Sequence, residues 1–303
     1  MKYFFVVNGR PDKKDLIDKD LEKQLADVDI QYEIYHTAGV GDGTRYVRVW
    51  CDLHEKEEAC FVACGGSGTL NEVASGLVGF RNKTLAYLAY GSTNDFIKHF
   101  PGRNWKSLND ILNGSSSMID IIKVNDNYSI NVVNVGFDAM AALYGYNYMQ
   151  KGIDGKTAYK RGAFRSLIGD RVNHIKVTAD GVTLNKRTLM MCTIGNASWC
   201  GGQFHCLPDA SVDDGLMDIC LIKPLSLLEF AALLPHYESG SLKNDEFCKG
   251  KAKFVRAKHV ELRSRDLIYL SLDGEILASR SVDLDIVPKA VQMIMPVRGE
   301  VRK

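Results

Sequence analysis

The first 125 residues alternate between short apolar runs and longer amphipathic segments. The apolar runs have the length of buried strands, and the amphipathic segments repeat their apolar residues at the spacing of a helix face. Strands separated by helix-length segments are typical of a parallel sheet with helices on both faces. The predicted strands are Tyr3–Val7, Ile30–Tyr35, Ala59–Ala63 and Thr84–Tyr90, and the predicted helices are Asp15–Val28, Arg45–Glu58, Thr69–Val78 and Asn94–Phe100.

The pattern changes after about Ser117, where strand-like runs replace most of the helical ones. Helical periodicity remains in Ala139–Met149, Thr157–Gly169 and Leu225–Leu234. We therefore expect a β-rich second half, either a sandwich or a curled sheet. Its predicted strands are Met118–Val124, Tyr128–Val135, Ile175–Ala179, Leu189–Gly195, Leu216–Ile222, His259–Ser264, Ile268–Leu272 and Val282–Val287, and a last apolar run, Val291–Pro296, fits either half.

Composition narrows the function classes. The chain has 38 Lys and Arg against 37 Asp and Glu, which gives a net charge of +1 and no basic surface of the kind that binds nucleic acid. No apolar stretch approaches the 18 residues of a membrane-spanning helix. The eight cysteines include no CxxC pair, and Cys200, His205 and Cys206 match no zinc module. We expect reduced thiols, a cytoplasmic protein and no nucleic-acid partner.

Small, hydroxyl and amide residues follow four consecutive predicted strands, at 8–10, 36–39, 65–72 and 91–95. In an open parallel sheet, ligands bind beyond the carboxyl ends of the strands. Gly65–Asn71 combines glycines, which let a backbone approach an anion, with the start of a predicted helix. It lacks the Gly-Lys-Ser/Thr of a P-loop and the third glycine of the dinucleotide fingerprint. A structural turn with Thr69 as N-cap explains this stretch alone, but the neighbouring polar turns favour a phosphate site.

Two acidic turns lie in the second half, PDASVDDGL at 208–216 and SLDGE at 271–275. Asp-Gly is a common hairpin signal, so each turn alone also fits a plain reversal of the chain. Beside a phosphate site, such carboxylates gain two uses, because they can hold Mg²⁺ or accept the proton of an attacking hydroxyl.

Six motifs in this order resemble the diacylglycerol kinase catalytic-domain family, in its soluble bacterial lipid kinase form. That family is related to the sphingosine kinases and more distantly to the NAD kinases, which lack the second motif. The resemblance spans the chain from about Val6 to the region of Pro296. The motifs are GGSGTLNEVASGL from Gly65, GSTNDF from Gly91, IDII at 119–122, GKTAY at 155–159, PDASVDDGL from Pro208 and LDGE from Leu272.

The resemblance implies an α/β plus mainly β fold. A doubly wound, parallel-sheet nucleotide-binding domain would cover residues 1–123. A β-sandwich domain would follow over residues 124–287, and residues 288–303 would return to the first domain.

The resemblance also implies ATP and Mg²⁺ as cofactors and assigns roles to particular residues. The base would be Glu275 or Asp273. A structural Mg²⁺ would bind the Asp214 side chain and the backbone carbonyls of Ser211 and Leu216. The expected nucleotide contacts are Thr37, Gly65, Gly66, Ser67, Gly68, Thr69, Leu70, Asn71 and Thr93.

Asp95 and Asp120 would belong to a surrounding acidic network. Asp95 also fits a plain role as an acid in the first turn of a helix. Asp120 lies on a mostly apolar strand, where a carboxylate without a partner would be costly to bury, and this favours the network role.

Two positions depart from the family pattern. Ser67 stands where the family has aspartate, and a serine hydroxyl carries no charge, although it can still donate a hydrogen bond to a phosphate. Ser67 therefore weakens metal binding or phosphoryl transfer unless Glu275 alone acts as the base. Asn8-Gly9-Arg10 replaces the usual Asn-Pro turn.

We expect an ATP-dependent lipid kinase with a diacylglycerol-like acceptor. It would be a peripheral protein at the inner membrane face. The sequence leaves open whether it forms a homodimer. The basic segment 156–171 could meet anionic headgroups, although a solvated helix face explains the same charges. Two alternatives remain: a nucleotide-binding regulator that lost catalysis through Ser67, and a kinase of a soluble hydroxyl compound.

Overall fold

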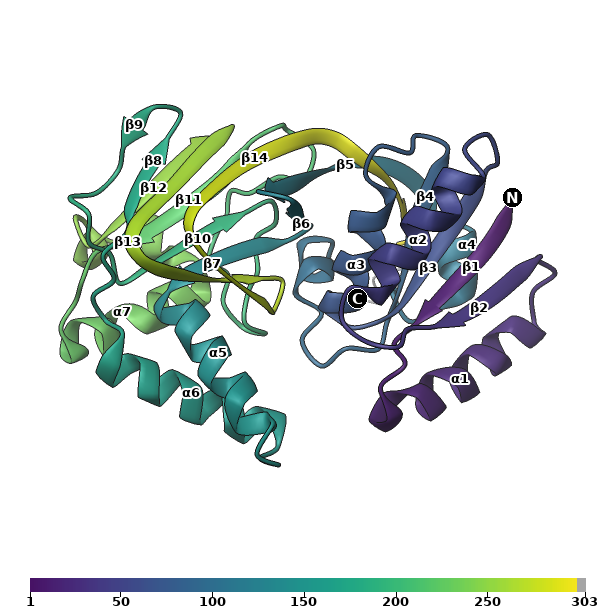
Figure 1. Cartoon of the computed structure of the whole chain (residues 1–303), viewed down its shortest axis with the longest axis horizontal. Helices are drawn as coiled ribbons and strands as arrows, with labels where there is room; N and C mark the ends of the chain where they lie inside the picture. Colours follow the sequence, from purple (N-terminus) through teal and green to yellow (C-terminus); the bar gives the residue numbers. More distant parts are fainter. Residues whose placement is uncertain (299–303) are drawn as a thin grey trace. The chain divides into compact units, whose positions relative to one another are not determined.

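The chain divides into two compact units in a computed structural model, which describes residues 1–298 apart from the side chains of residues 11, 12, 155 and 156 (Figure 1). Residues 299–303, the end of the segment expected to return to the first domain, lie outside the described residues. Unit 1 combines residues 1–121 with the chain from Pro288 onward, and unit 2 is Ile122–Val287. Two long strands, β5 (Ser115–Val124) and β14 (Glu275–Met295), contribute residues to both units.

Unit 1 is built on a parallel sheet in the order β2-β1-β3-β4-β14. Val7, the last residue of β1, pairs with His36 on one side and with Cys64 on the other, and Gly65 pairs in turn with Ala89. The carboxyl ends of these strands are therefore level, and the turns that follow them meet at one edge. The strands are β1 (Lys2–Val7), β2 (Tyr32–His36), β3 (Ala59–Gly65), β4 (Lys83–Ala89) and the C-terminal end of β14.

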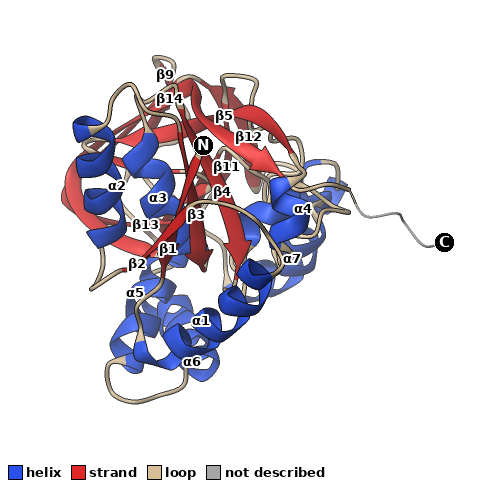
Figure 2. Cartoon of the chain, turned by 90° about the vertical axis from the view of Figure 1, so that its right-hand side faces the viewer, coloured by secondary structure: helices blue, strands red, loops and turns tan. Residues whose placement is uncertain are grey.

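Helices cover both faces of this sheet because its strands alternate apolar side chains between the faces. Phe5 packs in a core cluster that includes Ile17 of α1 and Ile111 of α4. On the other face, Phe4 lies against Trp50 of α2, with ring centroids 4.5 Å apart. Figure 2 shows α2 and α3 together on one side of β1 and β3. The helices are α1 (Pro11–Ala26), α2 (Asp42–Leu53), α3 (Ser67–Leu77), the 3₁₀ turn η1 (Asp95–His99) and α4 (Leu108–Leu112).

Unit 2 is built on antiparallel strands in the order β12-β11-β10-β7-β13-β14, and β8 also pairs with β13. A bulge between Arg263 and Ile268 divides β13 (His259–Leu272), so that the part before it pairs with β8 and the part after it pairs with β7. One strand thus serves two layers, as at the corner of a sandwich. The other strands are β6 (Asn127–Ser129), β7 (Val132–Gly136), β8 (Lys176–Ala179), β9 (Val182–Thr183), β10 (Met191–Gly195), β11 (Met217–Ile222) and β12 (Ala252–Ala257).

The core of unit 2 lies between these layers, where Val133, Ile194 and Leu262 belong to one cluster of buried residues. On the opposite face of β7 and β10, Val132 and Met191 pack instead with residues of the helices. The helices are α5 (Phe137–Met149), α6 (Gly155–Gly169), α7 (Leu227–Ser239) and the 3₁₀ turns η2 (Ser241–Lys243) and η3 (Glu246–Cys248). An α/β unit followed by a β-rich unit confirms the fold expected from the sequence.

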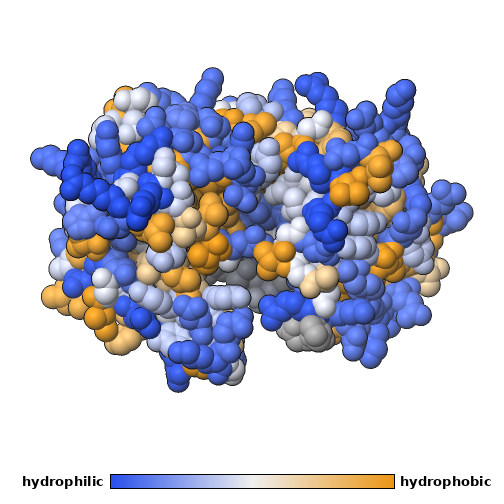
Figure 3. Space-filling view, viewed as in Figure 1, coloured by the Kyte–Doolittle hydropathy of each residue, from blue (hydrophilic) through white to orange (hydrophobic). Residues whose placement is uncertain are grey.

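Some large hydrophobic side chains are exposed among the described residues, for example Val40, Leu228 and Phe164. On the face drawn in Figure 3, groups of hydrophobic residues are separated by hydrophilic residues. None of the described helices is both long enough and apolar enough to cross a bilayer.

Several element boundaries differ from those predicted. Helix α3 begins at Ser67 after Gly66, so Thr69 is not its N-cap. The predicted strand 128–135 is interrupted, because Asp273 binds the backbone N–H groups between β6 and β7. The strands predicted at 259–264 and 268–272 are the single strand β13, and those at 282–287 and 291–296 are the single strand β14. Asn94–Phe100 yields only the 3₁₀ turn η1, and the sequence pattern missed α4, β9 and β12.

Unit 2 contains an acid with a strongly shifted pKa beneath its helices. Asp138, in the first turn of α5, accepts a hydrogen bond from Tyr237, whose hydroxyl also lies 2.8 Å from Thr193 Oγ1. Burial raises the pKa of Asp138 to about 7, against the weaker opposing effect of Tyr237. The folded chain therefore keeps a proton that the unfolded chain releases near pH 3.8.

Between these two pKa values the unfolded state binds fewer protons than the folded state, so this group makes the free energy of unfolding fall as pH rises. The loss continues as pH rises through about 7, the pKa of the folded state. In Asp138→Asn, urea unfolding between about pH 5 and about pH 8 should show a weaker pH dependence than in the wild type. Asp126→Asn, which changes an exposed acid, is the control. Parallel pH profiles for Asp138→Asn and the wild type would show that Asp138 is not protonated in the folded protein.

Candidate functional site

Side chains link the turns at the level strand ends of unit 1. Asn8 Nδ2 donates to Thr69 Oγ1 at 3.2 Å, and the backbone N–H of Gly9 donates to Thr37 Oγ1, also at 3.2 Å. The backbone N–H of Asn8 donates to the carbonyl of Cys64. The turns after β1, β2 and β3 thus form one connected surface. It includes Thr37 and Thr69, which were expected to contact the nucleotide, and Asn8, which was expected at this edge but not as a nucleotide contact.

Glycines allow these turns to approach one another backbone to backbone. A Cβ on Gly9 would lie 2.0 Å from the carbonyl oxygen of Thr37, and a Cβ on Gly91 would lie 2.6 Å from the Cα of Gly66. The turn after β4 is held by Asn94, which adopts a left-handed φ of 46°. Its amide accepts from the Tyr87 hydroxyl and donates to the carbonyl of Gly91, both at 2.8 Å. Asn94 lies in the turn 91–95 that the sequence placed at this edge, but its part in holding that turn was not predicted.

The N-terminus of α3 lies at this edge, since the helix begins directly after β3. No side chain caps the helix, and the first N–H to bond within this turn is that of Leu70, to Gly66 O at 3.0 Å. Among the described residues, nothing bonds to the buried Ser67 Oγ. The preceding N–H groups and the positive end of the helix dipole favour an anion here. This donor set fits the phosphates of a nucleotide.

The other residues predicted to contact the nucleotide differ in their exposure and in the polar groups they could present to a ligand. Thr93 is exposed in the turn after β4. Asn71 is 5% exposed, and Leu70 is 1% exposed with its N–H already bonded. Leu70 therefore supports the loop from the core instead of presenting a group to a ligand. Gly65 is packed against Thr69, since a Cβ there would lie 2.4 Å from Thr69 Oγ1.

The acids predicted for unit 1 have structural partners. Asp95 lies 2.6 Å from Lys98 Nζ within η1, which agrees with a first-turn acid. Asp120 is fully buried, and its carboxylate accepts the backbone N–H of Lys289 at 2.7 Å, at a left-handed residue of β14. Asp120 therefore fastens the strand that returns to unit 1. Their membership of an acidic network stays a prediction.

Glu72 holds α3 to α2. Its carboxylate accepts the backbone N–H groups of Gly41 and Gly43, at 2.9 Å and 2.8 Å, at the start of α2. Burial raises the pKa of Glu72, and these hydrogen bonds oppose the rise. Glu72 thus stabilises the packing of α3 against α2. The only sequence signal for this role was the position of Glu72 in the glycine-rich motif.

In unit 2, Asp273 lies in the hairpin between β13 and β14 and binds the turn before β7. One carboxylate oxygen accepts from Ser129 Oγ at 2.8 Å and from the backbone N–H groups of Ile130 and Asn131, and the other accepts the N–H of Val132 at 3.0 Å. Burial raises the pKa of Asp273 to about 6, and the hydrogen bonds oppose this rise. Both oxygens of Asp273 are therefore occupied, and Glu275, the other predicted base, is the first residue of β14.

The turn predicted to hold Mg²⁺ supplies oxygen donors, as this hard cation prefers. Asp214 forms an ion pair with Arg256 and accepts the backbone N–H of Leu216 at 3.1 Å. Ser211 Oγ donates to Asp213 at 2.8 Å. The donor set fits, although a cation at Asp214 has to compete with Arg256.

A different set of donors lies on α7 and η3. One donor atom each from His236, Asp245 and Cys248 lies within 4.8 Å of the others. Its nitrogen, oxygen and sulfur atoms differ from the oxygen sets that bind Mg²⁺.

Family models match both parts of the chain. Residues 2–124 match the diacylglycerol kinase catalytic domain, and residues 131–295 match the YegS C-terminal NAD kinase beta sandwich-like domain. The Bacillus subtilis diacylglycerol kinase is 27% identical over 264 residues, which are 86% of this chain and 84% of that protein. A Staphylococcus aureus diacylglycerol kinase is 27% identical over 268 residues, 86% of this chain and 82% of that protein.

A solved structure extends the likeness to the fold. The crystal structure of a diacylglycerol kinase from Bacillus anthracis superposes with a TM-score of 0.69 at 21% identity, over 97% of this chain and 96% of that chain. The two matched models together span most of the described residues. The chain belongs to the diacylglycerol kinase catalytic-domain family of bacterial lipid kinases, and it is a phosphotransferase with an alcohol group as acceptor.

Proposed function

We propose that this lipid kinase transfers the γ-phosphoryl group of ATP to a hydroxyl of a diacylglycerol-like lipid. The observation that carries the nucleotide assignment is the uncapped N-terminus of α3, where the buried hydroxyl of Ser67 has no hydrogen-bond partner among the described residues. Fixed donors of this kind stabilise the charge that spreads over phosphate oxygens during transfer, without rearranging at that moment.

In this transfer the acceptor oxygen forms a bond to the γ-phosphorus while the bond from that phosphorus to the β–γ bridging oxygen breaks, and ADP leaves. Glu275 accepts the proton of the acceptor hydroxyl. Asp273 is a positioning residue, because its hydrogen bonds to residues 129–132 fix the hairpin that carries Glu275. A Mg²⁺ bound by Asp214 and the carbonyls of Ser211 and Leu216 would supply positive charge.

Contact with a membrane surface follows from a lipid acceptor. Helix α6 supports such contact, because Phe164 and Ile168 are 67% and 62% exposed on a helix that also exposes Arg161 and Arg165. Apolar side chains among cations suit the boundary between headgroups and acyl chains.

The second candidate function is a nucleotide-binding regulator without turnover. The observation that favours it is the lack of charge at position 67, where the Ser67 hydroxyl cannot bind a cation as a carboxylate does. A kinase of a soluble hydroxyl compound is the remaining alternative, and the acceptor separates it from a lipid kinase.

The first test measures product and binding separately. Purified protein with Mg²⁺ and ATP should convert diacylglycerol in mixed micelles to phosphatidate. If Ser67 belongs to a working site, Ser67→Asp should lower this activity, whereas a crippled site should gain activity by about tenfold or more. ATP binding without product from lipid or soluble hydroxyl compounds, at any divalent metal tested, would overturn the kinase proposal in favour of the regulator.

The two acids of the late motif should separate activity from stability. Glu275→Gln should lower kcat by about 10²- to 10⁴-fold, the range for loss of a general base, with little change in the free energy of unfolding. Asp273→Asn places an amide where backbone donors point, and should lower the free energy of unfolding by about 1–3 kcal/mol. Urea unfolding and steady-state kinetics measure both effects. If Glu275→Gln keeps the wild-type kcat, Glu275 is not the general base.

Close packing of the turns should control nucleotide affinity. The Cβ in Gly91→Ala would lie 2.6 Å from the Cα of Gly66, so one of the two turns must move. We expect ATP binding, measured by calorimetry, to weaken by about tenfold or more, which corresponds to roughly 1.4 kcal/mol. Gly39→Ala is the matched control, because its Cβ would meet nothing within 4 Å. If Gly91→Ala and Gly39→Ala bind ATP with equal affinity, the Gly91 turn does not take part in nucleotide binding.

A further inference from the structure

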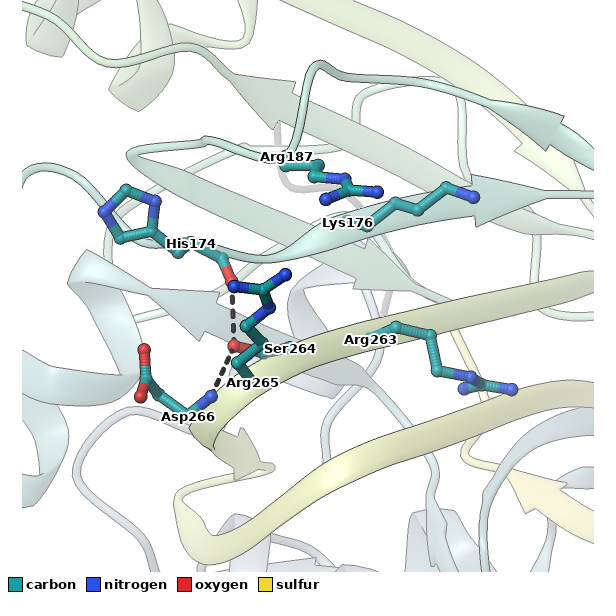
Figure 4. A pocket seen from close by; sticks show the side chains of 7 residues that line it. All are labelled: His174, Lys176, Arg187, Arg263, Ser264, Arg265 and Asp266. Carbon is teal, nitrogen blue, oxygen red and sulfur yellow. Dashed lines mark hydrogen bonds between the residues drawn. The ribbon is translucent and has the colours of Figure 1, made fainter.

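Unit 2 contains a basic hollow that none of the roles above uses. It has a volume of about 530 Å³ and lies at the bulge of β13. Its lining comes from the segment that enters β8, the loop between β9 and β10, and the bulge (Figure 4). The lining residues are His174, Lys176, Arg187, Arg263, Ser264, Arg265 and Asp266.

One of the four cations in this lining is neutralised locally. Arg263 lies 2.5 Å from Asp283 and 3.5 Å from Glu261, and Figure 4 shows its guanidinium directed away from the side chains of Lys176, Arg187 and Arg265. Among the described residues, no carboxylate lies within ion-pair distance of those three cations. The hollow therefore gathers three uncompensated cations and the single acid Asp266, a net charge of +2 (3 − 1).

Hydrogen bonds fix the walls of this hollow. Ser264 Oγ donates to the carbonyl of His174 at 2.8 Å and accepts the N–H of Asp266 at 3.1 Å, which ties the bulge to the start of β8. Asn185 holds the opposite loop, because its amide accepts the N–H of Val177 at 3.0 Å and donates to the carbonyl of Ile175 at 2.8 Å. The cations are thus carried by anchored backbone.

Two backbone features place the cations of this hollow. Lys176 lies directly opposite Arg263 across β8 and β13, and the guanidinium of Arg263 is already paired with Asp283 and Glu261. Arg187 adopts a left-handed φ of 70°, which is uncommon for a residue other than glycine, asparagine or aspartate. A bound anion would neutralise Lys176, Arg187 and Arg265, and guanidinium groups beside an ammonium suit phosphate oxygens.

We propose that this hollow binds a phosphate monoester, whose charge near −2 matches the net charge of its lining. The site is independent of the proposed transfer, since none of its residues is assigned to nucleotide, metal or base. The ester can come from a soluble compound or from the headgroup of phosphatidate, and the two arms of the test distinguish these sources.

The soluble arm follows the ring signals of His174 by NMR in histidine-labelled protein. Titration with glycerol 1-phosphate at constant ionic strength should shift them to saturation, whereas acetate should not. Arg187→Asn, which keeps a residue that tolerates the left-handed backbone, and Arg265→Gln should each weaken binding by about tenfold or more. Lys186→Gln is the control, because Lys186 is exposed on the same loop but does not line the hollow, and it should stay within about twofold.

The membrane arm measures cosedimentation with phosphatidylcholine vesicles that contain phosphatidate. Loss of cosedimentation in Arg187→Asn and Arg265→Gln, but not in Lys186→Gln, assigns the site to the lipid. A response in the soluble arm alone assigns it to a soluble ester. The proposal fails if His174 does not respond and cosedimentation is unchanged, or if the two arginine variants match the control while thermal unfolding shows that they are folded. Kinase activity enters neither readout.

Discussion

The candidate site of unit 1 depends on turns that touch through their backbones. Gly9 and Gly91 leave no room for a Cβ against Thr37 and Gly66, so the strand ends come close enough to present their polar atoms together. Because the strands end level, no side chain has to reach across the sheet, and short residues such as Asn8 and Thr37 suffice. An anion at this edge meets N–H groups that are fixed before it arrives, which is the condition under which such donors contribute most.

In unit 2 the backbone N–H groups between two strands need an acceptor, and a carboxylate supplies it. Between β6 and β7 the chain leaves the ladder, and the N–H groups of residues 130–132 turn toward the carboxylate of Asp273. One side chain therefore ends one strand, starts the next and fixes the hairpin that carries Glu275. This structural role of Asp273 leaves Glu275 as the proposed base of the motif. Asp120 has a similar role in unit 1, because its carboxylate accepts the backbone N–H of Lys289 and so holds β14 in place.

Motif and periodicity were sufficient to predict the order of the units, the parallel sheet and the turns at its edge, because each of these depends on local sequence. The predictions were wrong where the local structure depends on a residue far away in the sequence. Strand 128–135 is interrupted by a residue more than 130 positions away, and Thr69 looked like an N-cap although its hydroxyl accepts from Asn8. The bulge of β13 brings Arg265 beside Lys176 and Arg187. No local pattern contains this proximity, because the three residues come from separate segments of the chain.

The serine in the glycine-rich loop changes meaning once its surroundings are known. From the sequence, Ser67 is a missing charge, which suggests loss of function. In the structure, its hydroxyl is buried at the start of α3, and the backbone donors beside it do not depend on the identity of this side chain. Phosphate binding needs those donors and the dipole, whereas attraction of a cation needs a carboxylate. If the loop holds a nucleotide as proposed, the serine affects transfer and leaves the phosphate donors in place, and binding and turnover become separable properties of this loop.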